Sequence, residues 1–98
     1  MNTSEIIAGL ADCSNALRAE GVEHLAIFGS RARGDERPDS DLDVLVDIAP
    51  DARFSLINLS GVALLIEDKT GLPTQIVLRR AAPPEFIARI SDDLVQVF

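Results

Sequence analysis

The chain has 98 residues, of which 16 are acidic and 9 are basic, so its formal net charge is −7 at pH 7. This length allows a single core, and we expect residues 1–98 to form one domain with no separate substrate-binding domain. Because the acidic excess opposes attraction to phosphate backbones, we expect no direct binding of nucleic acid.

The sequence carries no membrane or disulfide signal. No apolar run reaches the roughly 18 residues of a membrane span, and the first residues lack the basic-then-apolar pattern of a signal sequence. We therefore expect no membrane association and a cytoplasmic location. Cys13 is the only cysteine, so no internal disulfide forms. Its apolar helical surroundings favour a small buried side chain over a metal or nucleophile role, since no Cys or His companion is near it.

The first half of the chain predicts a helix followed by two strands. Thr3 or Ser4 is suited to cap the helix, and Gly21 to end it. The apolar residues of this helix follow helical spacing and are Ile6, Ile7, Leu10, Cys13 and Leu17. The next elements are two strands and the charged loop between them, over Val22–Phe28, Asp41–Ile48 and Gly34–Ser40.

The second half predicts a longer helix over Phe54–Thr70 that ends at Gly71. Its apolar residues at helical spacing are Leu56, Leu59, Val62, Ala63 and Ile66. A strand, a short helix and an edge strand then follow, over Thr74–Leu78, Pro84–Ser91 and Leu94–Phe98. The alternation predicts an α/β fold, with a small mixed β-sheet and helices packed on it.

The turn after the first strand reads Gly29-Ser30-Arg31-Ala32-Arg33-Gly34 and is suited to hold phosphate. Gly29 lets the backbone approach a bulky anion, and Ser30 adds a hydroxyl beside backbone N–H groups that are free if a helical turn starts there. Arg31 and Arg33 carry permanently charged forks that match phosphate oxygens, although one of them is expected to face solvent or an acidic neighbour.

Two aspartates, Asp41 and Asp43, open the second strand and share one of its faces. Their Cα atoms would lie roughly 6–7 Å apart, so both carboxylates could reach one or two hard cations. Two Mg²⁺ ions about 3.5–4 Å apart are the usual clamp for displacement at phosphorus. The alternative is that the pair marks the solvent face of a strand. Together with the turn, the pair favours a metal-bound nucleoside triphosphate.

The segment Ile27 to Asp47 resembles the signature of the DNA polymerase β superfamily, a Gly-Ser pair followed by D-x-D. The form G-S-R-A-R-G…S-D-x-D-x-x-V is similar to that of the minimal nucleotidyltransferases, the MNT domain proteins. The resemblance implies a polymerase β-like nucleotidyltransferase fold. It also implies that Gly29 and Ser30 hold the triphosphate, while Asp41 and Asp43 bind magnesium.

The chain departs from this family pattern at Gln75. The family usually supplies a third carboxylate from a later strand, and counting from Gly71 places Gln75 at that position. A glutamine carbonyl accepts hydrogen bonds but cannot take a proton, so water, substrate or another acid would have to do so. Asp47 shares the face of Asp43 but lies about 13 Å along the strand. Glu67 and Asp68 fall on the preceding helix.

The resemblance implies Mg²⁺-dependent transfer of a nucleoside monophosphate from ATP or another NTP to an acceptor hydroxyl. Members of the family often act as the antitoxin of a helical HEPN ribonuclease toxin, which they adenylylate on a tyrosine. The alternative is a catalytically impaired nucleotide-binding module that neutralises a partner protein by binding it. Two further alternatives stay open. His24 is either structural or a proton shuttle, and Arg79-Arg80 either ends a strand in solvent or lines the nucleotide site.

Overall fold

The computed structural model describes residues 1–98 and contains one four-stranded mixed sheet in the order β3-β2-β1-β4. The strands are β1 (Val22–Phe28), β2 (Leu42–Ile48), β3 (Thr74–Leu78) and β4 (Val95–Gln96). β1 pairs antiparallel with both β2 and β4, whereas β2 and β3 run parallel. The α/β fold with a small mixed sheet, predicted from the sequence, is confirmed.

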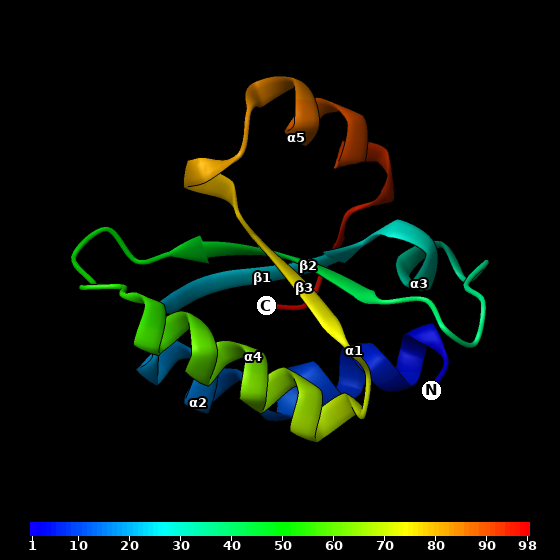
Figure 1. The fold of residues 1–98 in the computed structure, drawn as a ribbon, viewed down its shortest axis with the longest axis horizontal. Helices are drawn as coiled ribbons and strands as arrows, with labels where there is room; N and C mark the ends of the chain where they lie inside the picture. Colours follow the sequence, from blue (N-terminus) through cyan, green and yellow to red (C-terminus); the bar gives the residue numbers. More distant parts are fainter.

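Helices cover both faces of this sheet (Figure 1). The helices α1 (Thr3–Asp12), α2 (Ser14–Ala19) and α4 (Leu56–Thr70) lie along one face. On the opposite face, α5 (Pro84–Ile90) arches over the sheet between two short 3₁₀ segments, η1 (Arg79–Ala81) and η2 (Ser91–Asp93). The short helix α3 (Gly29–Arg33) joins the ends of β1 and β2. No helix combines the length and the apolar character that crossing a bilayer requires.

The core lies between the sheet and the α1, α2 and α4 layer. Leu42, Val44 and Val46 of β2 are fully buried there, which confirms the predicted separation of these side chains from the aspartates. The remaining buried residues of the cluster come from β1 and the three helices, and they are Ile6, Leu10, Leu17, Val22, Leu25, Ile27, Val62 and Ile66. This packing fixes the position of β2, from which Asp43 projects on the other face.

The first helix differs from its prediction. Its N-cap is Asn2, not Thr3 or Ser4, and the side chain of Asn2 accepts from the Glu5 amide while the Glu5 carboxylate accepts from the Asn2 amide. The helix also breaks at Cys13, whose backbone leaves the helical region, so α1 and α2 are separate elements. The Cys13 thiol is half-buried and donates to the Gly9 carbonyl at 3.2 Å.

The prediction that Leu56 packs in the core is wrong, because its side chain is 81% exposed. The buried line of α4 runs through Val62, Ile66 and Thr70, and a residue six positions before Val62 lies about a third of a turn away from it. The helix begins at Leu56 behind the Ser55 N-cap and ends at Gly71 as expected. Ile57 and Leu64 are also exposed.

The C-terminal segment closes the free edge of β1. Only Val95 and Gln96 form the strand β4, which is shorter than the predicted Leu94–Phe98. Hydrogen bonds continue beyond it, since the Leu25 amide donates to the Phe98 carbonyl at 3.1 Å and the Val97 amide donates to the Leu25 carbonyl at 2.8 Å. Phe86 of α5 packs edge-on against Phe28, so α5 is held over the face that carries Asp43.

Candidate functional site

The turn between β1 and α3 depends on Gly29. Its φ angle is +76°, a region that side chains rarely adopt. A Cβ at this position would lie 3.3 Å from the Asp43 Cγ and nearer still to the Oδ2. Gly29 is therefore required both by its backbone conformation and by the close approach of the Asp43 carboxylate.

The register of the central strands brings the turn and the aspartates together. Phe28, the last residue of β1, is the Cα partner of Asp43 in β2, so their side chains share a face and Gly29 follows directly. Asp43 is half-buried, whereas Asp41 is exposed and precedes the strand. The two carboxylates predicted from the sequence thus lie beside the predicted phosphate turn.

The electrostatics of the site set Asp43 apart from an ordinary surface carboxyl. Partial burial raises the pKa of Asp43, and the negative charge of Asp41 raises it further, while Arg33 acts in the opposite direction. The two aspartates therefore repel each other. A divalent cation between them would remove this repulsion.

The start of α3 is suited to receive an anion. Its N-cap position is Phe28, and no side chain caps it, so the first N–H groups of this helix lack that partner. Ser30 is half-buried at this position. The structure contains no enclosed pocket, which leaves the turn and the aspartates on an open surface.

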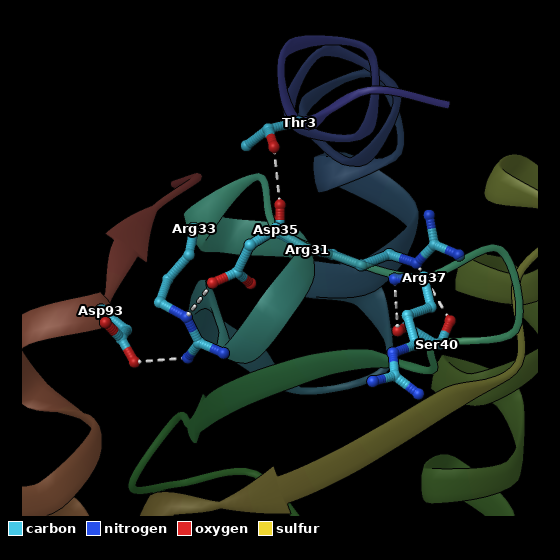
Figure 2. Close-up of polar contacts among 7 residues, drawn as sticks. All are labelled: Thr3, Arg31, Arg33, Asp35, Arg37, Ser40 and Asp93. Atoms are coloured by element: carbon cyan, nitrogen blue, oxygen red, sulfur yellow. Dashed lines mark hydrogen bonds and ion pairs between the residues drawn. The ribbon is translucent and has the colours of Figure 1, made fainter.

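The Arg31 side chain donates its hydrogen bonds to backbone carbonyls. Its side chain is buried, and it runs from α3 to the loop before β2, as Figure 2 shows. The Nε donates to the Ser40 carbonyl at 3.0 Å and an Nη donates to the Pro38 carbonyl at 3.4 Å. These contacts give Arg31 a structural role that its sequence pattern did not predict.

Arg33 points the other way and meets two carboxylates (Figure 2). Its Nε lies 3.2 Å from an oxygen of Asp35, and an Nη lies 2.9 Å from an oxygen of Asp93 in η2. The prediction that one arginine faces an acidic neighbour is confirmed for Arg33. Asp93 was not identified from the sequence, because it is 60 residues away and no local pattern links the two positions.

Gln75 lies beside Asp43 on the neighbouring strand. It is the Cα partner of Asp43 across the parallel pair of β2 and β3, so both side chains share the face under α5, and Gln75 is exposed. The Asp47 carboxylate accepts a hydrogen bond from the Arg79 Nε at 2.7 Å. β3 carries no carboxylate, and Asp47 of β2 is held by Arg79 away from the turn.

The other candidate residues lie at the opposite end of the sheet. His24 is exposed near the start of β1, opposite Asp47. Arg79 and Arg80 follow the end of β3, whereas the phosphate turn lies beyond the end of β1 that pairs with the start of β2. The structure does not bring these three residues to the turn.

The residues present fit a magnesium ion that arrives with a nucleotide. No group of three or more His, Cys, Asp or Glu side chains is arranged to hold a metal ion alone. Mg²⁺ typically takes one or two protein carboxylates and completes its shell with water and substrate phosphates. Asp41 and Asp43 supply two such carboxylates. The charge of Asp41 raises the pKa of Asp43, which indicates that the two groups lie close together.

Comparison with known proteins gives a match over most of the chain. The family described as "Nucleotidyltransferase domain" matches residues 10–97. A candidate protein adenylyltransferase of Methanocaldococcus jannaschii is 30% identical over 81 residues, which are 83% of this chain and 85% of that protein. A second candidate from the same organism is 27% identical over 77 residues, which are 78% and 76% of the two chains.

Solved structures agree in fold. The structure of a candidate minimal nucleotidyltransferase superposes with a TM-score of 0.75 at 27% identity and covers 97% of this chain and 95% of that one. A toxin–antitoxin structure with AMP-PNP gives 0.69 at 19% identity, covering 100% and 73%. A tri-AMPylated Shewanella oneidensis HEPN toxin in complex with its MNT antitoxin gives 0.62 at 15% identity, covering 90% and 68%. The last two likenesses concern the fold alone.

Proposed function

The chain belongs to the nucleotidyltransferase domain family, and from this premise we propose that it is a Mg²⁺-dependent protein adenylyltransferase. It would transfer adenylate from ATP to an acceptor hydroxyl and release pyrophosphate. The observation that carries the proposal is the pairing of Phe28 with Asp43, which sets the phosphate turn directly beside the aspartate pair. An anion-binding turn beside two neighbouring carboxylates is what a metal–nucleotide complex requires.

Each residue has a role in this proposal. Gly29 and Ser30 receive the triphosphate, and Asp41 and Asp43 hold the magnesium. Bound magnesium would neutralise phosphate charge and align the phosphates for in-line displacement. The acceptor oxygen forms a bond to the α-phosphorus as the bond to the pyrophosphate oxygen breaks. Because the Gln75 amide cannot take the acceptor proton, that proton leaves to water or to a substrate oxygen.

Two observations support a protein acceptor. The sequence relatives are named candidate protein adenylyltransferases, and one structural neighbour is an MNT antitoxin bound to a tri-AMPylated HEPN toxin. We propose that this chain likewise pairs with a small helical HEPN-type protein and modifies it. The net charge of −7 also favours a protein over a nucleic acid as acceptor.

Calorimetry with ATP, with and without Mg²⁺, tests the nucleotide site. Asp41→Asn combined with Asp43→Asn should abolish the metal-dependent part of ATP binding and leave the fold intact, because both side chains lie outside the core. Asp47→Asn is the matched control, since it removes one carboxylate from the same strand face away from the turn. Equal Mg²⁺-dependent affinity in the wild type and the double variant would contradict the metal assignment.

Transfer is tested with labelled ATP and any small helical protein that a neighbouring reading frame encodes. Wild type should label the partner, and the double aspartate variant should not. Gln75 keeps a second candidate function open, in which the chain binds nucleotide and neutralises its partner without transfer. Tight partner binding by both wild type and double variant, with no label transferred by either, would favour that binding module.

A further inference from the structure

Arg31 is a buried cation with no carboxylate partner. Its exposed fraction is 4%, and none of the four ion pairs of the structure includes it. Burying a guanidinium is costly unless its donors are satisfied. Here the donors reach two backbone carbonyls, of Ser40 and Pro38, both in the loop that leads to Asp41. The side chain thus links α3 to that loop (Figure 2).

The loop has little regular structure to hold it otherwise. Residues 34–41 contain no helix or strand, and Asp41 precedes the first residue of β2. Within the loop, the Ser40 amide donates to the Arg37 carbonyl at 3.0 Å and the Arg37 amide donates to the Ser40 hydroxyl at 2.9 Å. These bonds shape the turn but do not attach it to the rest of the protein. Asp35, at the start of the loop, is attached to α3 by its amide, which donates to the Ser30 carbonyl at 3.1 Å. The end of the loop next to Asp41 is attached by the two bonds from Arg31.

The other end of Arg31 is anchored as well. Its carbonyl accepts from the Thr3 hydroxyl at 2.6 Å, which joins α3 to the first turn of α1. Arg31 therefore lies between a helix packed on the core and the residue that immediately precedes Asp41. Asp43 needs no such support, because its position in β2 is fixed on both sides by pairing with Phe28 and Gln75.

We propose that Arg31 is a positioning residue that holds Asp41 at the distance from Asp43 needed for joint metal binding, and that it does not contact phosphate itself. This inference rests on the proposed metal–nucleotide site. A ligand on an unpaired segment samples many positions, and fixing it reduces the entropy lost when the metal binds. Outer-shell partners of this kind typically change metal affinity by about 10–100-fold when they are removed.

A double-mutant cycle separates the two roles of Arg31. Calorimetry would give the affinity for AMP-PNP with Mg²⁺ in wild type, Arg31→Gln, Asp41→Asn and the double variant. Arg31→Gln should weaken binding about 10-fold in wild type. When Asp41→Asn is already present, Arg31→Gln should change the affinity by less than about twofold, because Arg31 acts through Asp41. Arg37→Gln is the matched control, since it removes one positive charge from the same loop without touching these carbonyls.

Hydrogen exchange of the loop amides provides a readout independent of the nucleotide. Arg31→Gln should speed exchange at residues 35–41 and leave β1 unchanged, whereas Arg37→Gln should leave both unchanged. If Arg31→Gln does not fold, Arg31→Lys carries the same tests, because its single ammonium cannot reproduce the fork to two carbonyls. Arg31→Lys should weaken the affinity and speed the exchange, as Arg31→Gln does, but to a smaller extent.

The outcomes are distinct. An equal loss of affinity from Arg31→Gln with and without Asp41 would overturn the inference, and so would unchanged loop exchange. In either case the proposed metal site stands if wild type binds AMP-PNP more tightly with Mg²⁺ than without it. If Mg²⁺ has no effect on wild-type binding, the proposed function fails and this inference fails with it.

Discussion

The Asp43 carboxylate occupies the space that a side chain on Gly29 would need. An added Cβ would collide with the Asp43 Oδ2 and lie 3.3 Å from the Cγ, so the carboxylate would have to move from its position beside the turn. The turn at Gly29 and the strand β2 are therefore matched to each other at this one contact. Changes at either residue should be coupled.

Gly29→Ala should destabilise the protein more than Gly71→Ala. Both glycines have positive φ, +76° and +69°, so both substitutions carry about 1–2 kcal/mol of backbone strain. Nothing lies within 4 Å of a Cβ at Gly71, whereas Gly29→Ala also meets Asp43 and should cost about 1–3 kcal/mol more. Urea unfolding measures the difference. Adding Asp43→Ala to Gly29→Ala should recover part of the loss, and equal losses at the two glycines would contradict the contact.

Asp43→Asn should raise stability at neutral pH. Because the fold raises the pKa of Asp43, the folded protein binds a proton at this group more readily than the unfolded chain does. The contribution of Asp43 to stability is then fully present below the pKa that this group has in the unfolded chain. It is lost as the pH rises through the pKa that the group has in the folded protein. The urea midpoint of the variant should exceed that of wild type at pH 7, and the gap should close toward about pH 4. Asp47→Asn, which loses an ion pair with Arg79, should show no gain.

Gln75→Asp should increase adenylate transfer. The residue is the Cα partner of Asp43, so a carboxylate there would share the face of the aspartate pair and could take the acceptor proton. General-base catalysis contributes on the order of 10²–10⁴-fold, so an imperfectly placed acid should still raise the rate measurably. Gln75→Asn is the control, since asparagine has the shape of the aspartate in the tested variant but no charge. A rate that does not change would show that another group accepts the proton.

Asp93→Asn should strengthen ATP binding by releasing Arg33. The two side chains are 44% and 29% exposed, so solvent weakens their ion pair and its loss should hardly move the unfolding midpoint. An arginine freed from Asp93 is available to phosphate, and the gain should be about twofold to fivefold at low salt and vanish at high salt. Asp92→Asn, at an exposed neighbour without an ion pair, should leave affinity unchanged. A gain that persists at high salt would argue against this mechanism.

Most of the fold follows from local patterns. The bounds of β1 and β3 agree with the prediction to the residue, because Gly21 and Gly29 flank β1, and Pro73 and Arg79 flank β3. The break at Cys13 could not be predicted, since the apolar spacing continues through it and both halves remain buried. Leu56 was grouped with the apolar residues at helical spacing, but it lies about a third of a turn from the buried line of α4 and is exposed.

The site was predictable where its residues are close in the sequence. The Gly-Ser pair lies in one turn and the D-x-D aspartates lie at the start of one strand, so local geometry was enough to predict how each pair is arranged. Counting along the later strand predicted the position of Gln75 beside Asp43. The partners of the arginines were not predictable. Arg31 and Arg33 differ in burial although they lie two residues apart, because α3 turns one toward the loop and the other toward η2. Only the three-dimensional arrangement separates them.

The pairing of Phe28 with Asp43 also bears on the order of folding. The segment β1–α3–β2 closes over a short stretch of chain, whereas β4 pairs with β1 only after nearly the whole chain has been brought together. Short closures cost less entropy, so this hairpin should form early and β4 should dock late. The turn and both aspartates lie within the early unit, and Gln75 lies on a strand that joins it afterwards. We therefore expect a substitution at Gln75 to leave the formation of the β1–α3–β2 unit unchanged.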